Sequence, residues 1–467
     1  MKELKKSLRY GLNMWEESLA IVGDEPARIS NEEYESRQNR IFSQLKNSDL
    51  LIITNPHEST RSNDVHYHYR SSSDMIYLTG WRDPESTFCA YNDNGEWKRV
   101  LFVQPKDVLK EIWEGRRPGI EGAVSEFPID ESYSITEIDD KLSQMLVNCS
   151  RVFVKLGVDN NVDNLVEYEV KRNSRDRQKF GTGPMSIVDP SPIINELRLR
   201  KSQGEIALMR HSAKVASQAH IQAMANTKPG IGEWQLEGVI EGLFKYCKTD
   251  GISYPCIIGS GENATILHYN VNNDVCNEGE VILIDAGCEY EGYASDITRS
   301  WPVNGKFSEA QTEIYEIVLE SQLAAIDKCR VGNPYDAPHK EARRVLAEGL
   351  IRIGVIEQSL EDALAPDGEL GNWYMHGTGH WLGLDVHDVG IYRPNDEPRV
   401  FEEGMVITVE PGLYFGAWRP DVDCPPRYAN IGIRIEDDVL ITKEGPDVLS
   451  RDCPKTIADI EAIVGTA

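Results

Sequence analysis

The sequence predicts a mixed α/β (α+β) protein with two domains, and three features of the chain support this class. At 467 residues, the chain is too long for one ordinary hydrophobic core. Short apolar runs that are typical of strands alternate with amphipathic runs that are typical of helices. The proline-rich segment 189–192 interrupts this pattern, so we expect an N-terminal α/β domain over residues 1–192 and a second domain over residues 193–467.

The N-terminal half begins with an amphipathic helix pattern, which is followed by apolar segments of strand length. The helix is expected over residues 31–46. The strands are expected at 50–54, 88–91, 100–103 and 152–154. Strands that alternate with helices imply an α/β domain.

The C-terminal half repeats one order of elements in outline. In its first part, helix and strand patterns are expected at 203–226, 233–248, 256–258, 280–286 and 292–303. In its second part, they are expected at 309–329, 340–353, 405–410 and 431–439. Ser308 and Gln311 have the spacing of a capping box, which supports a helix start at residue 309. We therefore expect two helix-plus-strand halves that each contribute residues to one site.

Composition and charge narrow the functional classes. The formal net charge of −27 would repel nucleic-acid backbones and anionic lipid, so we expect neither as a partner. The nine cysteines include no C-x-x-C pair, which argues against a disulfide framework and a zinc knuckle. No signal-peptide pattern and no apolar stretch of about 18 residues occurs, so we expect a soluble, cytoplasmic protein.

Two aspartates follow strand patterns in the first part of the C-terminal half. Asp285 ends the apolar run Val281-Ile-Leu-Ile, and Asp296 follows in Tyr293-Ala-Ser-Asp296. We expect two strands joined by a turn at 288–292, and adjacent strands lie about 4.8 Å apart, so both carboxylates could share a pair of cations. Taken singly, each aspartate is more often a capping or salt-bridged residue.

A glycine-rich segment with three histidines follows in the second part. It reads His376-Gly-Thr-Gly-His380-Trp-Leu-Gly-Leu-Asp-Val-His387, and its glycines let the backbone approach a centre closely. Such a segment is rarely a core, so a functional role is favoured. Histidines outside any motif are interpreted as structural or solvent-exposed: His57, His211, His220 and His339.

Two glutamates complete the set of candidate ligands. Glu410 ends the apolar run Met405-Val-Ile-Thr-Val and precedes Pro411, which stops strand pairing. Glu436 lies in Ile431-Gly-Ile-Arg-Ile-Glu436, where strand alternation places Arg434 and Glu436 on one face. An arginine in that position can orient a ligating carboxylate. The simpler interpretation is a surface ion pair.

Four carboxylates and one imidazole, with no cysteine, describe a hard metal site. Such a site suits Mn²⁺, Co²⁺, Zn²⁺ or Fe²⁺ better than a structural zinc. Two cations about 3.5–4 Å apart can bridge a water, lower its pKa towards about 7 and polarise a scissile carbonyl. The sequence therefore predicts a two-metal hydrolase in which histidines or Glu410 pass protons to the leaving group.

These motifs, in this order, resemble the pita-bread metallopeptidases, and aminopeptidase P (Xaa-Pro aminopeptidase) more than its relatives. The resemblance covers nearly the whole chain. Four further segments carry it: Gly259-Ser-Gly-Glu-Asn-Ala-Thr-Ile-Leu-His268-Tyr, Val303-Asn-Gly-Lys-Phe307, Thr60-Arg-Ser-Asn-Asp64 and Tyr69-Arg-Ser-Ser-Ser-Asp74. It implies a C-terminal pita-bread domain with internal pseudo-symmetry and release of the first residue from peptides whose second residue is proline.

The resemblance also implies roles for individual residues. Asp285 would bind one manganese ion, His380 and Glu410 the other, and Asp296 and Glu436 both. The cavity would be lined by His268, His376 and His387, of which His268 and His387 would contact substrate around the proline. Glu410 would orient the nucleophilic water, a metal-bridging hydroxide that attacks the Xaa-Pro bond.

Other implied contacts lie outside the ligand set. Tyr254 matches a pocket tyrosine, and Asp64 matches an acid that receives the free amino terminus. Trp113 resembles a tryptophan that reaches a neighbouring subunit's site, which implies a homo-oligomer, a tetramer or a dimer. The arginine that binds longer peptides in the family has three candidates here: Arg172, Arg175 and Arg177.

One departure from the family pattern and several alternatives stay open. Thr378-Gly379 stands where close relatives often have Leu-Ser, which affects pocket shape and not metal binding. The nearest alternative is a prolidase that cleaves only Xaa-Pro dipeptides, and a methionine aminopeptidase would not need so large a first domain. An inactive pita-bread module that binds peptides would normally have lost ligands. A dehydrogenase or nucleotide binder is disfavoured because Gly259-Ser-Gly261 completes no phosphate-binding motif.

Overall fold

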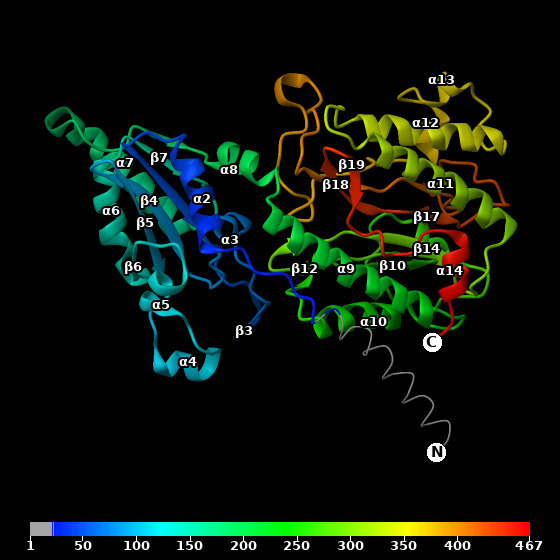
Figure 1. The fold of residues 1–467 in the computed structure, drawn as a ribbon, viewed down its shortest axis with the longest axis horizontal. Coiled ribbons are helices and arrows are strands. Elements are labelled where there is room, and N and C mark those ends of the chain that lie inside the picture. Colours follow the sequence, from blue (N-terminus) through cyan, green and yellow to red (C-terminus); the bar gives the residue numbers. More distant parts are fainter. Residues whose placement is uncertain (1–20, 22) are drawn as a thin grey trace, which may run out of the picture. The chain divides into compact units, whose positions relative to one another are not determined.

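The computed structural model describes residues 21 and 23–467, which form two compact units (Figure 1). Unit 2 comprises Ile29–Arg198, and unit 1 comprises Leu199–Ala467 together with the described residues before Ile29. Both units combine helices and sheets, which confirms the mixed α/β class.

Unit 2 is built on a six-stranded mixed sheet with the order β6-β5-β4-β1-β7-β8. Its strands are β1 (Asp49–Thr54), β4 (Thr87–Asp93), β5 (Glu96–Val103), β6 (Glu131–Ser134), β7 (Arg151–Val154) and β8 (Ser186–Val188). Strand β1 pairs antiparallel with β4 and parallel with β7. Leu50, Phe102 and Val152 are fully buried, so the apolar runs of the sequence form the core of this unit as expected.

Helices and a small hairpin complete unit 2. They are α2 (Asn31–Phe42), the hairpin β2 (Thr60–Ser62) and β3 (Val65–His66), α3 (Ser73–Thr79), α4 (Val108–Glu114), α5 (Gly119–Glu126), η1 (Ile135–Glu137), α6 (Ile138–Asn148), α7 (Asn160–Phe180) and α8 (Ser191–Arg198). Asp189 and Pro190 separate β8 from α8 as expected, but Pro192 lies in the first turn of α8 and does not interrupt it. Proline is tolerated in a first helical turn, whose N–H groups have no partner within the helix. The unit therefore ends after Arg198, which donates to Asp74 at 2.8 Å, and not after Pro192.

The first part of unit 1 has two helices and two antiparallel sheets of three strands. They are α9 (Gln203–Asn226), α10 (Glu233–Tyr246), β9 (Gly251–Ile252), β10 (Ile257–Ser260), η2 (Gly261–Thr265), β11 (Val281–Asp285), β12 (Cys288–Tyr290), β13 (Tyr293–Ala294) and β14 (Thr298–Pro302). The sheet orders are β10-β11-β14 and β13-β12-β9. Residues of α9, α10 and β11 share one hydrophobic core, which includes Ala219, Leu236 and Ile282.

The second part of unit 1 has a similar composition. Its elements are α11 (Glu309–Lys328), α12 (Ala337–Arg352), α13 (Leu360–Ala363), η3 (Glu369–Asn372), η4 (Pro394–Asp396), β15 (Val406–Val409), β16 (Gly412–Tyr414), β17 (Gly432–Arg434), β18 (Asp437–Thr442), β19 (Gly445–Val448) and α14 (Ile457–Ile463). The sheet orders are β15-β18-β19 and β16-β17. Ser308 and Gln311 form the expected capping box at the start of α11.

Two strands expected to be continuous are broken. The expected strand at 292–303 divides into β13 and β14, and that at 431–439 divides into β17 and β18, so that each pair joins different sheets. The turn expected at 288–292 is also wrong, because residues 288–290 form β12. Alternation along one sequence cannot reveal such breaks, since partner strands cause them. Asp296 and Glu436 lie at these two breaks.

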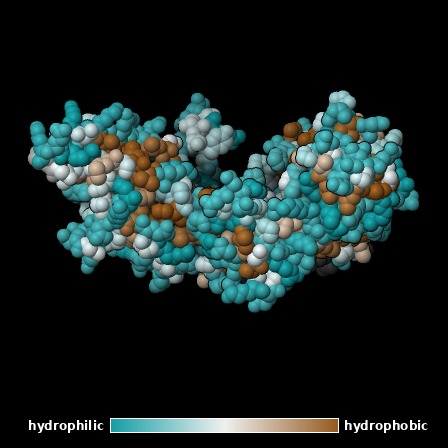
Figure 2. Space-filling view, turned by 90° about the horizontal axis from the view of Figure 1, so that it is seen from above, coloured by the Kyte–Doolittle hydropathy of each residue, from teal (hydrophilic) through white to brown (hydrophobic). Residues whose placement is uncertain are grey.

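The face shown in Figure 2 is mainly hydrophilic, with hydrophobic residues in scattered patches. All nine cysteines are unpaired. Within the described part of the chain, no helix combines the length and apolar character needed to cross a bilayer.

Candidate functional site

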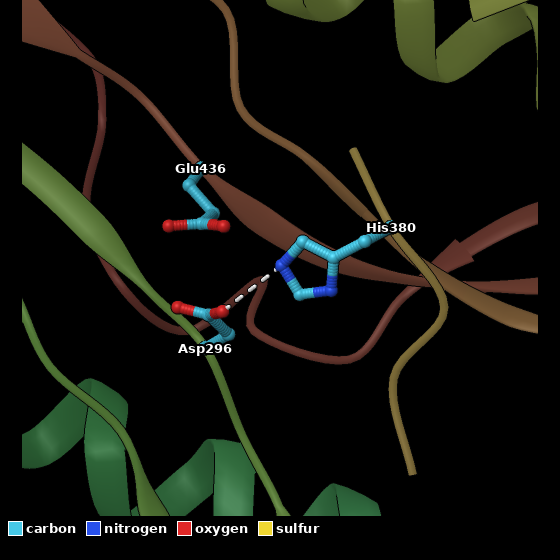
Figure 3. Close-up of side chains that lie close together, drawn as sticks. All are labelled: Asp296, His380 and Glu436. Carbon is cyan, nitrogen blue, oxygen red and sulfur yellow. Dashed lines mark ion pairs between the residues drawn. The ribbon is translucent and has the colours of Figure 1, made fainter. Parts of the chain in front are cut away.

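Three of the expected ligands converge on one point in unit 1. One side-chain atom each of Asp296, His380 and Glu436 lies within 4.8 Å of the others. The two carboxylates face each other, and the imidazole of His380 points towards the space between them (Figure 3). Because the three residues come from distant segments, tertiary folding alone brings them together.

A cavity of about 300 Å³ opens beside this cluster. All five expected ligands line it, together with Tyr254, His268 and His387. The remaining lining residues are Pro255, Ile257, Asn270 and Val386. The cavity therefore combines acids, imidazoles and a short apolar wall, as is typical of a small-ligand site.

The first half of unit 1 places its two aspartates through a close backbone approach. Asp285 is the last residue of β11 and pairs with Thr298 of β14. A Cβ atom on Gly287 would lie 1.8 Å from the carbonyl oxygen of Ser295, so only glycine fits here. The backbone N–H of Asp296 donates to the carboxylate of Asp438, at 3.2 Å to Oδ1.

The second half places His380 and Glu410 in a similar way. The backbone N–H of Glu410 donates to the carbonyl of Thr378 at 2.8 Å, and that of Thr408 donates to the carbonyl of His380 at 3.0 Å. A Cβ atom on Gly379 would lie 1.9 Å from the carbonyl oxygen of Thr408. The histidine segment thus lies directly against β15, and Glu410 follows that strand directly.

A network of polar side chains supports the acids. Arg434 donates to Asp285 at 2.6 Å and to the hydroxyl of Thr298 at 3.1 Å. Thr298 in turn donates to Glu436 at 2.6 Å. The hydroxyl of Tyr254 lies within hydrogen-bonding distance of both aspartates, at 2.5 Å from Asp285. The expected role of Arg434 in orienting a ligating acid is consistent with these contacts.

Burial and mutual repulsion shift the titration of the acids. Burial raises the pKa of Glu410 to about 7, although His380 opposes the shift. Burial and the neighbouring Asp296 raise the pKa of Glu436 well above its usual value. Burial would lower the pKa of His380, but its contact with Asp296, at 3.4 Å, raises that pKa to about 9. Clustered buried acids with too little positive charge cause these shifts.

The donor set fits divalent cations. His380 donates from Nδ1 to the carbonyl of Trp381 at 3.0 Å, which directs Nε2 towards Asp296, where it could bind a cation after losing its proton. Asp285, Asp296 and Glu436 are at most 8% exposed, and Arg434 is the arginine that faces them. A buried excess of carboxylates is costly unless cations are bound there. Four carboxylates with one imidazole suit Mn²⁺, Zn²⁺, Co²⁺ or Fe²⁺.

Some expected site residues are not among those that line the cavity. His376 does not line the cavity; it contacts the hydroxyl of Tyr414 at 2.8 Å and lies 3.7 Å from Glu410. Asp64 and Trp113 belong to unit 2, where both are exposed. Of the three candidate arginines, Arg175 is exposed, whereas Arg172 pairs with Glu169 and Arg177 donates to the carbonyl of Pro184.

The structure adds residues that the sequence did not indicate. Thr298 connects Glu436 to Arg434, and Asp438 accepts the backbone N–H of Asp296. Tyr414 connects His376 to Arg434. The sequence offered one indication of these residues, their closeness to candidate ligands: Thr298 lies two residues after Asp296, and Asp438 lies two residues after Glu436. Threonine and tyrosine are too common in strands for that signal to be decisive.

Together, the two-part α/β unit and its buried cluster of acids with one imidazole define a metallohydrolase. The model of metallopeptidase family M24 matches residues 207–443, and that of the aminopeptidase P N-terminal domain matches residues 34–153. The chain belongs to the aminopeptidase P group of metallopeptidase family M24.

Individual relatives agree with this assignment. The chain is 39% identical to the Xaa-Pro aminopeptidase of Escherichia coli (strain K12) over 94% of this chain and 99% of that protein. It is similar in structure to zinc-substituted Escherichia coli aminopeptidase P in complex with product, with a TM-score of 0.89, 39% identity and coverage of 94% and 98% of the two chains. The Pseudomonas aeruginosa aminopeptidase PepP also has a TM-score of 0.89, with 38% identity and coverage of 93% and 98%.

Proposed function

We propose that this protein is a metal-dependent aminopeptidase that releases the first residue from peptides with proline in the second position. The convergence of Asp296, His380 and Glu436 at the wall of a cavity carries this proposal. The relatives named Xaa-Pro aminopeptidase supply the substrate class. An Xaa-Pro bond needs a dedicated site, because its nitrogen has no hydrogen for a general peptidase to bind.

The proposed cofactor is a pair of divalent ions, with manganese first and zinc, cobalt and iron as alternatives. The residues that would hold them are Asp285, Asp296, His380, Glu410 and Glu436. When bound, the ions supply positive charge that acidifies water and polarises the carbonyl of the scissile bond. The zinc-substituted relative supports a divalent ion in this family.

The chain's own residues handle protons and substrate. Glu410, which lines the cavity, would accept a proton from the attacking water and return it to the leaving group. His268 and His387 line the cavity and would contact the peptide around the proline. Tyr254 would donate to a bound group, while His376 would act through Glu410.

Residues of unit 2 extend the proposal. Asp64 would receive the amino terminus, and Arg175 is the candidate for binding longer peptides. Helix α4 exposes four hydrophobic side chains, those of Val108, Leu109, Ile112 and Trp113, the last at 88%. Exposed apolar groups of this kind are typical of association surfaces, so we expect a homo-oligomer, a tetramer or a dimer. The nine free thiols support a reducing, cytoplasmic location.

The test compares an Xaa-Pro-Xaa tripeptide, an Xaa-Pro dipeptide and an Xaa-Ala-Xaa tripeptide, with products identified by mass spectrometry. We expect cleavage of the first bond of the proline tripeptide, which needs added metal and is absent in Asp296→Asn. Cleavage of the dipeptide alone would favour a prolidase. Metal uptake without cleavage of any of these peptides would favour an inactive peptide-binding module.

A further inference from the structure

Glu233, the first residue of helix α10, is fully buried and is not part of the site described above. Its carboxylate accepts five hydrogen bonds. Oε1 accepts from the backbone N–H and hydroxyl of Ser260, at 2.8 and 2.9 Å, and from the side-chain amide of Asn263 at 3.2 Å. Oε2 accepts from the hydroxyl of Tyr269 and the backbone N–H of Asp274, both at 2.9 Å.

All five donors belong to one segment, residues 260–274. That segment leaves β10, forms the short helix η2 and carries His268 and Asn270 to the wall of the cavity. The side chain of His268 is exposed, so packing does not hold it. Its position therefore depends on the backbone around it, which Glu233 holds on both sides.

A second contact fastens the same segment to α10. Asn272 is 2% exposed, has a positive φ of 50° and donates to Glu237, one turn after Glu233, at 2.9 Å. Its side chain also accepts from the backbone N–H of Ile258 at 3.0 Å. The segment is thus held at several points by one face of one helix.

Hydrogen bonds, and not an ion pair with a basic side chain, stabilise the carboxylate of Glu233. Among the residues that the structure describes, no lysine, arginine or histidine side chain pairs with it. A buried carboxylate needs several hydrogen bonds to remain in place, and each of these bonds orders its donor. The arrangement is therefore specific for an acceptor with two oxygens.

We propose that Glu233 is a positioning residue that holds segment 260–274 so that His268 faces the substrate. The proposal rests on the proposed function, since it assigns His268 to the substrate cavity. It predicts that Glu233 acts on catalysis through His268 and not through the metal ligands, none of which it contacts.

The informative variant is Glu233→Gln, which keeps the shape and replaces one acceptor oxygen by an NH₂ group. Whichever way the amide turns, that group faces a backbone N–H, either of Ser260 or of Asp274, which cannot reverse its polarity. We expect a kcat/KM on an Xaa-Pro-Xaa tripeptide about 10- to 100-fold below wild type, as for a misplaced active-site group. Bound metal per chain, measured by elemental analysis, should equal that of wild type.

A double-mutant cycle with His268→Ala separates positioning from general damage. In the His268→Ala background, Glu233→Gln should lower kcat/KM by less than about 2-fold, because the group that it positions is absent. An equal loss in both backgrounds would overturn the proposal. Tyr269→Phe removes one donor without creating a mismatch and should show a loss of less than about 5-fold. Glu241→Gln, the same change at an exposed position of α10, should match wild type.

Hydrogen–deuterium exchange tests the holding of the segment without any assay of activity. Peptides covering residues 260–274 should exchange faster in Glu233→Gln than in wild type, and peptides covering 405–410 should not change. Unchanged exchange in the segment would overturn the inference whatever the activity. Wild-type protein that cleaves no Xaa-Pro peptide would instead refute the proposed function.

Discussion

Gly379 lies between His376 and His380 in the sequence, and its backbone lies against Thr408 of β15. We expect Gly379→Ala to disable the site. The new Cβ would lie 1.9 Å from the carbonyl oxygen of Thr408, where Cβ atoms essentially never approach within 3.0 Å. The segment and β15 would therefore have to separate by about 1 Å, and a displacement of that size can cost about 100-fold in rate. Overpacking of this kind also lowers the free energy of unfolding by about 1–3 kcal/mol.

The structure offers a matched control in the same segment. A Cβ on Gly377 would meet no atom within 4 Å, so Gly377→Ala makes the same chemical change in open space. We expect Gly377→Ala to keep kcat/KM within about 3-fold of wild type, since surface changes away from such features have small effects. Tripeptide cleavage, metal content and urea unfolding should be measured on both variants. Equal activity in the two variants would refute the claim that this close approach positions His380 and Glu410.

Three further predictions concern the buried pairs, pH and metal. Lys201 pairs with Asp388 at 2.9 Å, and both side chains are 1% exposed. Lys201→Met would leave the buried carboxylate unpaired, so it should lower the free energy of unfolding by about 3–5 kcal/mol. The double variant Lys201→Met/Asp388→Leu should recover most of that loss. A single-variant loss below about 1 kcal/mol in urea unfolding would contradict this reasoning. Burial lowers the pKa of His220 to about 4, below its unfolded value of 6.5. Between pH 6.5 and pH 4 the unfolded chain therefore binds a proton that the folded chain does not, and the free energy of unfolding falls by about 3 kcal/mol as the pH is lowered through this range. Urea unfolding of His220→Leu should lack that part of the pH dependence. Identical pH profiles for the variant and wild type would contradict this role of His220. Excess chelator should abolish cleavage and lower the melting temperature. The free energy of unfolding that is lost should be about 3–4 kcal/mol if metal was present at about 100–1,000 times its Kd. A melting temperature unaffected by chelator and by added Mn²⁺ would argue against a bound ion.

Much of the fold was predictable because apolar periodicity is a local property. The helix expected at 203–226 matches α9 (Gln203–Asn226), and the capping box at Ser308 marks the start of α11. The errors occurred where local pattern competes with partners far along the chain. The strand expected at 431–439 divides because β17 pairs with β16 and β18 pairs with β15.

The candidate site shows the same division. The sequence singled out four acids and one imidazole because each ends or follows a distinctive motif, and all five line one cavity. His376 was expected at the cavity from its motif, yet it is not among the lining residues and instead contacts Tyr414, 3.7 Å from Glu410. The direction of a side chain within a glycine-rich segment depends on packing, which sequence spacing does not describe.

The sequence by itself determined the types of candidate ligand, their order along the chain and the class of chemistry, because these depend on residue identity and short-range periodicity. Only the tertiary structure decided which groups meet. Thr298 and Glu436 are 138 residues apart and form a 2.6 Å hydrogen bond, and the donors to Glu233 come from a segment 27 to 41 residues away. Such contacts arise when strands from different parts of the chain pair and bring their side chains to one face, and no local pattern encodes that pairing.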